Sequence, residues 1–483
     1  MHNWWDSVRA LYSVRRLSTT LAYMLQNTEY QPLPYLRWFW RTQNFSRVMH
    51  RRTLENTRAT RTIRLAVTLG ALGYIAFALL FMFGAGLSYN PGAFWYGAAA
   101  LVAYPIVWAH ILALGVGVGR VLVLAPREKK NASQAAAIFQ AHPGLKIAIA
   151  GSYGKTSMKE LLETVLREGK RVAATPGNMN VVSSHARFAR SLSGDEEIVI
   201  VEFGEGRPGD VALFSRALRP THGVITGIAP AHLDQYITLQ AAAKDIFSLA
   251  SYVPAEQVYV NAEPDAVHGF LRPDFRIYSR TTTLGWHVQK VETGVDGTTF
   301  ELVKGKRRLK LKSGLIGLHM VGPLAFVAAF SLQLGLTEAQ VAKGVAKTKP
   351  FEHRMQPYAI GGATVIDDTY NGNLEGIRAG TELLATLKAK RKIYVTPGLV
   401  DQGKETAAIH REVGALAAAA KPDVVVLMQN SVTKHIQAGL HGAGYGGEII
   451  VQDDPLHFYT NLDSFVASGD VVLMQNDWTD NYA

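Results

Sequence analysis

The sequence contains no cysteine among its 483 residues, which excludes disulfide bonds and thiolate metal sites. It also lacks lysine and is nearly free of acidic residues at its N-terminus. Residues 1–64 hold eleven arginines and three acidic side chains, so this segment carries a net charge of +8 out of the +11 of the whole chain. A basic segment of this kind favours an anionic partner, either nucleic acid or lipid.

Residues 65–119 contain no Asp, Glu, Lys or Arg. The stretch Ser88–Gly92 ("SYNPG") divides them into two apolar runs. Each run is long enough to cross the roughly 30 Å hydrocarbon core of a bilayer at about 1.5 Å per residue. The sequence therefore predicts a hairpin of two transmembrane helices over residues 65–125. A signal peptide explains the tract less well, because its apolar region would be shorter and closer to the N-terminus.

The charges beside the two runs predict their orientation. Arginines precede the first run, cations from Arg120 to Lys130 follow the second, and the connecting turn has no charge. The positive-inside rule then places both ends in the cytoplasm, which predicts a multi-pass protein of the cytoplasmic membrane with cytoplasmic catalytic domains. Because aromatic residues interleave with the arginines of residues 1–64, a membrane-interface segment is favoured over a nucleic-acid site. His110 is predicted to be a neutral, packed imidazole.

Beyond residue 126, apolar strands alternate with helical patterns, which predicts an α/β fold with parallel sheets. The first buried strand is Leu145–Ala150 ("LKIAIA"), followed by the turn "GSYGKTS" and a helix ending near Gly169. Backbone N–H groups of such a turn, together with the helix N-terminus, surround phosphate oxygens. The turn therefore predicts a nucleotide site.

The motif in this turn is the short form GxxGK[ST] of the P-loop, because Ile149 stands where the longer form has its first glycine. Lys155 would reach the β- and γ-phosphates, and Thr156 would hold Mg²⁺. ATP and Mg²⁺ are therefore the expected cofactors. The predicted phosphate-binding residues are Gly151, Ser152, Gly154, Lys155, Thr156 and Ser157.

Two further apolar strands end in side chains suited to a metal. One strand ends at Glu202, and another is predicted to end at His232. Because the carboxyl ends of parallel strands form the ligand crevice of an open α/β sheet, both side chains are expected to face the P-loop. A carboxylate and an imidazole at this edge predict ligands for Mg²⁺.

Eight short motifs occur along the chain in a fixed order: "GSYGKTSMKE", "TPGNMN", "VEFGEGRPGD", "ITGIAPAHLDQY", "AAAKDIF", "GLHMVGPLAFVAAF", "VIDDTYNGN" and "TPGLVDQGKE". In this order the chain resembles the Mur ligases of peptidoglycan synthesis, most closely the MurF branch, from about Lys146 to Val472. The resemblance implies a central P-loop ATPase domain over residues 126–350 and a C-terminal Rossmann-like domain over residues 351–483. It also implies an ADP-forming ligase that joins an amine to a carboxylate through an acyl phosphate.

The same resemblance implies roles for further residues. Lys244 matches a lysine that is carbamylated in the family, where the carbamate helps to hold a second Mg²⁺. The implied catalytic residues are thus Lys155, Lys244 and His232, and the implied metal ligands are Thr156, Glu202, His232 and Lys244. His319 matches a nucleotide-binding histidine. Residues matching the segment that closes over the nucleotide are Arg354, Asp367 or Asp368, Tyr370, Asn371 and Asn373.

The chain also departs from the family pattern. Met320 follows His319, where the family has an asparagine that contacts the adenine, and "QNDWTDNYA" replaces a basic, glycine-containing segment. The DNPR signature of the diaminopimelate-adding branch is missing. Residues 1–125 stand in place of a domain that binds a UDP-linked sugar, which suggests that the bilayer itself holds a lipid-linked acceptor at high effective concentration.

Three functions therefore compete. The first is a MurF-like ligase that joins a UDP-linked or lipid-linked peptide carboxylate to an amino acid or dipeptide amine, with membrane lipid and no nucleic acid as a further partner. The second is a polyglutamate-type synthetase, and the third is a membrane-anchored P-loop ATPase without ligase activity. The motifs "TPGNMN" and "TPGLVDQGKE" favour the first over the second. Amine-dependent release of ADP separates both ligases from the ATPase.

Overall fold

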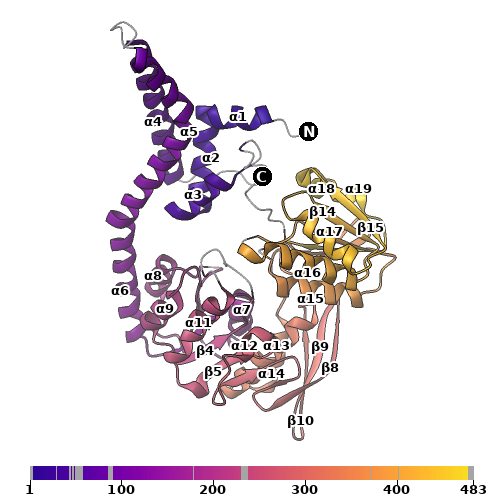
Figure 1. Ribbon diagram of the computed structural model, residues 1–483. Helices are drawn as coiled ribbons and strands as arrows, with labels where there is room; N and C mark the ends of the chain where they lie inside the picture. Colours follow the sequence, from indigo (N-terminus) through magenta and orange to yellow (C-terminus); the bar gives the residue numbers. More distant parts are fainter. Residues whose placement is uncertain are drawn as a thin grey trace. The chain divides into compact units, whose positions relative to one another are not determined.

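The structure is a computed structural model that describes residues 4–28, 30–42, 45, 48, 58–84, 91–177, 179–229, 236, 238–370, 372–400 and 402–476. The chain divides into two compact units, Met1–Arg127 and Glu128–Thr479. Figure 1 shows an all-helical first unit and a second unit built from two sheets covered by helices.

The first unit contains the helices α1 (Trp4–Tyr12), α2 (Val14–Asn27), α3 (Pro32–Arg41), α4 (Arg58–Gly84) and α5 (Pro91–Gly119). Helices α4 and α5 pack against each other, α2 packs on α4, and α3 packs on α5. The side chains of Tyr35 and Trp38 are buried in the shared core, whereas Trp5 and Trp40 are each 61% exposed. The predicted interface segment therefore contains three helices, which pack onto the apolar hairpin.

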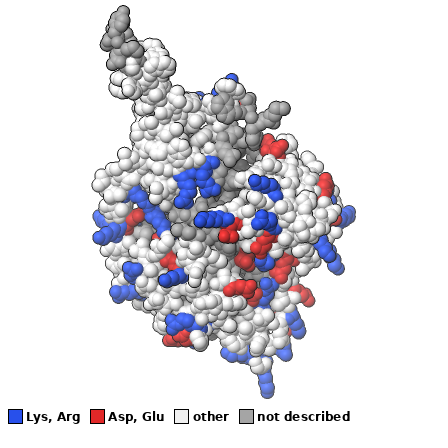
Figure 2. All heavy atoms as spheres, viewed as in Figure 1, with Lys and Arg blue, Asp and Glu red and all other residues white. Residues whose placement is uncertain are grey.

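Two helical stretches, Thr60–Gly84 and Phe94–Ala141, are long and apolar enough to cross a membrane. In the most apolar 18-residue stretch of each, only 17% and 11% of the residues are buried, so neither is a core helix of the unit. The outer part of the α4 and α5 hairpin is free of charged side chains, as Figure 2 shows. The second stretch runs through a π-helical turn, η2 (Arg120–Leu124), into α6 (Ala125–Ala141), so the predicted domain boundary at residue 125 falls inside a continuous helix.

The sheet of the middle domain has ten strands in the order β10-β9-β8-β7-β6-β5-β4-β1-β3-β2. Strands β1 to β6 are parallel, as the sequence predicts, whereas β6 to β10 are antiparallel neighbours that the sequence did not predict. The reason is the tight turns between the last strands, such as the one at Gly305 with φ +59°. The strands are β1 (Leu145–Ala150), β2 (Val172–Ala174), β3 (Ile198–Glu202), β4 (His222–Ile225), β5 (Val258–Asn261), β6 (Arg276–Tyr278), β7 (Thr282–Thr283), β8 (Trp286–Gly294), β9 (Gly297–Lys304) and β10 (Arg307–Ser313).

Helices cover both faces of this sheet. In β1, Ile147 and Ile149 enter one hydrophobic core, and Ala148 and Ala150 enter the other, because successive side chains of a strand point to opposite faces. The first core includes α7 (Lys155–Leu166), α13 (Val321–Gln333) and α14 (Glu338–Ala346). The second includes α6, α8 (Val182–Ser191), α9 (Asp210–Leu218) and α11 (Leu239–Phe247), and the short α12 (Asp265–His268) follows β5.

The C-terminal domain has a six-stranded sheet in the order β11-β12-β16-β13-β14-β15, in which only the β11 pairing is antiparallel. Helices lie on both faces, as expected for a Rossmann-like domain. The strands are β11 (Gln356–Ile360), β12 (Ala363–Asp368), β13 (Arg391–Thr396), β14 (Val424–Met428), β15 (Glu448–Gln452) and β16 (Asp470–Gln475). The helices are α15 (Leu374–Thr386), α16 (Thr406–Ala419), α17 (Thr433–Gly442), α18 (Pro455–Thr460) and α19 (Leu462–Phe465).

Candidate functional site

The P-loop connects the end of β1 to the start of α7. Gly151 has φ +148°, and a Cβ built there would lie 2.2 Å from Thr226 Oγ1, so the turn requires glycine. Gly154 is the N-cap residue of α7, with φ +72° and no side-chain cap hydrogen bond. The first-turn N–H groups of α7 are therefore available to an anion, and the turn fits the phosphates of a nucleotide.

Lys155 forms a buried ion pair with Glu205. Its Nζ donates to Glu205 at 2.7 Å and to the carbonyl oxygen of Gly151 at 2.5 Å. The two charged residues are only 8% and 6% exposed. Glu205 lies in the loop between β3 and α9, within the quoted motif "VEFGEGRPGD", but its partnership with Lys155 was not predicted from the sequence.

Thr156, at the start of α7, and Glu202, at the end of β3, are hydrogen-bonded to each other. The Thr156 hydroxyl donates to Glu202 Oε1 at 3.0 Å, and the Asn180 amide donates to the same oxygen at 3.3 Å. Glu202 is the last residue of β3, pairs in register with Ile149, and is 1% exposed. A hydroxyl and a carboxylate are hard oxygen ligands of the kind that Mg²⁺ prefers, so the donor set fits this ion.

Lys159 is a second cation in this region, and it was not predicted from the sequence. It lies one helical turn after Lys155, is fully buried, and donates to the carbonyl oxygen of Gly177. Its ammonium group is 3.6 Å from Glu202 Oε2 and 3.2 Å from Glu160 Oε1. The spacing of four residues places Lys159 on the same face of α7 as Lys155, but its contact with Gly177 depends on the fold.

His185 holds the end of β3 through a hydrogen bond to its backbone. Its Nε2 donates to the backbone oxygen of Glu202 at 2.8 Å. Burial lowers the pKa of His185 to about 4, so the ring is neutral near pH 7. The Thr175 hydroxyl also accepts from the backbone N–H of Glu202, at 3.1 Å. The position of the Glu202 carboxylate is thus set by its backbone contacts.

The predicted strand leading to His232 is too long. Strand β4 ends at Ile225, because Gly227 turns with φ +154° and its carbonyl accepts from the N–H of Ser152 in the P-loop. His232 lies outside the described residues, in the gap between Ala229 and Tyr236. Its role as a metal ligand and catalytic residue stays a prediction.

Lys244 lies on α11 with an exposed side chain, and its carbamylation stays a prediction. Its neighbour Asp245 is buried and accepts from the Tyr236 hydroxyl and from the N–H of Gly209, both at 2.8 Å. An unmodified lysine cannot hold a metal ion when charged. No group of three His, Asp or Glu side chains suited to a metal occurs among the described residues, so a complete metal site also stays a prediction.

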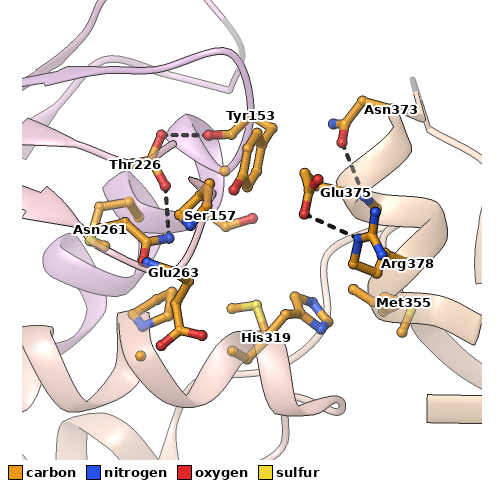
Figure 3. Close-up of a pocket in the computed structure, with 18 of the residues that line it drawn as sticks. Tyr153, Ser157, Thr226, Asn261, Glu263, His319, Met355, Asn373, Glu375 and Arg378 are labelled. Carbon is orange, nitrogen blue, oxygen red and sulfur yellow. Dashed lines mark hydrogen bonds and ion pairs between the residues drawn. The ribbon is translucent and has the colours of Figure 1, made fainter. Parts of the chain in front are cut away.

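A cavity of about 610 Å³ lies between the middle and C-terminal domains. Figure 3 shows Tyr153, Ser157 and Asn261 on one wall and Glu375 and Arg378 on the other. The predicted nucleotide-binding residues that line it are Gly154, Ser157, His319, Arg354 and Asp368. Lys155 and Thr156 are not among the residues that line the cavity.

His319 and Met320 contribute to the floor of the cavity. Burial, with a smaller effect of the nearby Arg280 charge, lowers the pKa of His319 to about 4, so its ring is neutral near pH 7. Met320 is only 8% exposed and presents an apolar side chain where the family pattern has an amide. This floor suits an apolar ring face better than a hydrogen-bonded edge.

Two groups on the C-terminal wall are suited to bind a polar ligand. The guanidinium of Arg354 lies 4.4 Å from the centre of the Tyr370 ring, both of them lining the cavity. Asp368 accepts from Gln475 Nε2 at 2.9 Å and from the N–H of Met355 at 3.2 Å. Burial raises the pKa of Asp368 to about 7 despite these hydrogen bonds. Asn371 lies outside the described residues, and Asn373 caps α15 through the N–H of Gly376.

Sequence comparisons relate both domains to known proteins. The family model described as Mur ligase middle domain matches residues 149–330, and the one described as Mur ligase, glutamate ligase domain, matches residues 353–475. The UDP-N-acetylmuramoyl-tripeptide–D-alanyl-D-alanine ligase of Mycobacterium tuberculosis is 29% identical over 365 residues, covering 72% of this chain and 71% of that protein. The Escherichia coli ligase of the same name is 26% identical over 348 residues, covering 70% and 75%.

Structural comparison finds the same architecture. The MurF ligase from Thermotoga maritima, solved in complex with ADP, matches with a TM-score of 0.64 and 22% sequence identity. The match covers 72% of this chain and 80% of that one. At this identity the likeness establishes the fold of the two domains.

Proposed function

Because the chain belongs to the Mur ligase family, we propose that it is an ADP-forming, ATP-dependent ligase of peptidoglycan precursor synthesis. Its expected substrates are a muropeptide carboxylate and an amine of the D-alanyl-D-alanine type, as the names of its relatives suggest. The observation that carries the proposal is the cavity between the domains, which joins the P-loop to Arg354 and Asp368 of the C-terminal domain. A ligase needs this arrangement, because the nucleotide and the two reacting ends must meet in one place.

The proposed reaction has two steps. An oxygen of the substrate carboxylate forms a bond to the γ-phosphorus of ATP while the bond to the bridging oxygen breaks, which releases ADP and leaves an acyl phosphate. The amine nitrogen then bonds to the acyl carbon, inorganic phosphate leaves, and the amine loses a proton. The sum is ATP plus carboxylate plus amine to ADP, phosphate and amide.

The residues of this chain have separate tasks in that reaction. The first-turn N–H groups of α7 and the Lys155 ammonium bind the phosphates and offset their charge. The oxygens of Thr156 and Glu202 would hold Mg²⁺. When bound, the ion supplies charge stabilisation for the transferring phosphoryl group. Arg354, stacked on Tyr370, offers a cation from the opposite wall of the cavity.

We also propose that the ligase is anchored in the cytoplasmic membrane by α4 and α5, with both catalytic domains in the cytoplasm. Two apolar helices of sufficient length and the cations at their ends support this arrangement. An anchored enzyme would meet a lipid-linked peptide at high effective concentration, so such an acceptor is the finer proposal. A UDP-linked peptide is the alternative acceptor.

The test uses purified full-length protein in vesicles, with ATP and Mg²⁺. ADP release is measured against UDP-linked and lipid-linked peptides, each with D-alanyl-D-alanine or glutamate as amine. Release that requires both a peptide and an amine supports the ligase, and the mass of the product identifies both partners. ADP release that neither substrate changes contradicts it and indicates an ATPase. Faster ligation of the UDP-linked peptide than of the lipid-linked peptide would contradict the lipid-linked acceptor but not the ligase activity.

A further inference from the structure

Glu205 is the anionic partner of the P-loop lysine, Lys155. Both carboxylate oxygens of Glu205 are 2.7 Å from Lys155 Nζ, and the pair is almost completely buried. A second bond, to the carbonyl oxygen of Gly151 at 2.5 Å, folds the lysine side chain back over the turn. The ammonium group is therefore held at the P-loop by two acceptors of the chain itself.

The fold fixes the position of Glu205. It belongs to the loop from Phe203 to Gly209, whose far end is fastened by Asp245 and by the Tyr236 hydroxyl. Tyr236 donates to the carbonyl oxygen of Arg207 at 3.0 Å, and Asp245 accepts from Gly209. With this end fastened and Glu202 fixed at the end of β3, the loop has little freedom to carry Glu205 away from Lys155.

We propose that Glu205 is a positioning residue that holds Lys155 at the P-loop of the nucleotide-free protein and competes with the phosphates of ATP for its ammonium group. The inference rests on the proposed ATP-dependent function, in which Lys155 contacts the β- and γ-phosphates. A carboxylate and a triphosphate are both anions, so each weakens the binding of the other to one cation. Glu205 therefore lowers the affinity for ATP while keeping the lysine in place.

The alternative is that the pair only stabilises the fold. Glu301 offers a matched control, because it is also 6% exposed and forms an ion pair with a lysine, Lys290, at 3.1 Å. It lies on β9 and does not line the cavity. Glu301→Gln removes a buried carboxylate charge without a direct effect on nucleotide binding. It should cost less stability than Glu205→Gln, because Lys290 is 69% exposed whereas Lys155 is buried.

The test measures the Kd of ATP and of ADP by calorimetry on full-length protein with Mg²⁺ and without carboxylate or amine. We expect Glu205→Gln to bind ATP about tenfold more tightly, because one anionic charge is removed beside the phosphates. The gain for ADP should be smaller, because ADP lacks the γ-phosphate. Glu301→Gln should leave both values unchanged.

A second variant keeps the charge and moves it. Glu205→Asp shortens the side chain by one methylene and lengthens the ion pair, so its Kd for ATP should fall between the wild type and Glu205→Gln. This variant also serves if Glu205→Gln does not fold. Unchanged or weaker ATP binding in these variants would show that the pair only stabilises the fold. If the wild-type protein itself does not bind ATP, the proposed function is contradicted instead.

Discussion

The guanidinium of Arg280 binds the carboxylate of Glu382, with Nη1 to oxygen distances of 3.1 and 3.3 Å. Arg280 follows β6 in the middle domain, and Glu382 lies on α15 in the C-terminal domain. Arg280 also binds Glu263 through its Nε at 2.8 Å, and all three side chains line the cavity. This group links the two domains at the edge of the cavity.

Glu382→Gln is expected to weaken this link. Both side chains are 39% exposed, so the loss of stability should be below about 1 kcal/mol. The KM for ATP should rise several-fold, because the walls of the cavity are held together less firmly. The matched control is Glu338→Gln, since Glu338 pairs with Arg307 at 2.6 Å within the middle domain and neither residue lines the cavity. Equal effects of both variants on KM would contradict a role for the interdomain pair.

Lys155→Ala should abolish ATP turnover while the protein stays folded. The lysine acts on charge that develops during phosphoryl transfer, so its loss should lower kcat by at least about a hundredfold. The change is measured as ADP release, with circular dichroism as a check of the fold. Lys170→Ala is the control, because Lys170 forms a surface ion pair with Glu197. Unchanged ADP release in a folded variant would rule out the P-loop assignment.

Lys244→Arg should lose ligase activity if Lys244 is carbamylated. A fixed guanidinium cannot ligate Mg²⁺, whereas a carbamate supplies an anionic oxygen. Mass spectrometry of gently handled wild-type protein should detect the addition of one carbon dioxide. The control is Lys434→Arg, at an exposed lysine on α17. Normal activity of Lys244→Arg would show that Lys244 is only a solvated position on α11.

Asp368→Asn tests the raised pKa of this cavity carboxyl. Its pKa is raised from 3.8 to about 7 in the folded protein, so between these values the folded chain keeps a proton that the unfolded chain releases. Stability contributed by Asp368 is therefore present below about pH 4 and is lost as the pH rises toward 7. Melting temperatures of nucleotide-free protein at pH 5 and pH 7 measure the effect. The drop from pH 5 to pH 7 should be smaller in Asp368→Asn, and an equal drop would contradict the raised pKa.

The sequence predicted the parts of the site that depend on local pattern. The P-loop follows from a buried strand, a glycine turn and a helix start, and Glu202 follows from the end of the next parallel strand. Lys159 and Glu205 were missed because each takes its role from a partner brought near by the fold: Lys159 contacts Gly177, and Glu205 contacts Lys155. Such pairings between separate segments have no signature in the spacing of residues.

The N-terminal unit shows a second limit of prediction from the sequence. Tryptophan and tyrosine next to arginine look the same in sequence whether they face lipid headgroups or a neighbouring helix. The structure buries Tyr35 and Trp38 against the apolar hairpin but leaves Trp40 exposed. The antiparallel strands β7 to β10 were missed because they are joined by two-residue turns that read as loops. Both outcomes depend on packing between elements rather than on the pattern within one.

The transfer of oxygen from the substrate carboxylate to inorganic phosphate tests the central claim most directly. A peptide acceptor carrying a heavy oxygen isotope in its carboxylate is incubated with the protein, ATP, Mg²⁺ and the amine, and the phosphate is analysed by mass spectrometry. Ligation through an acyl phosphate predicts that each phosphate released with product carries one labelled oxygen. Phosphate that takes its new oxygen from solvent alone would contradict the account and identify the protein as an ATP hydrolase.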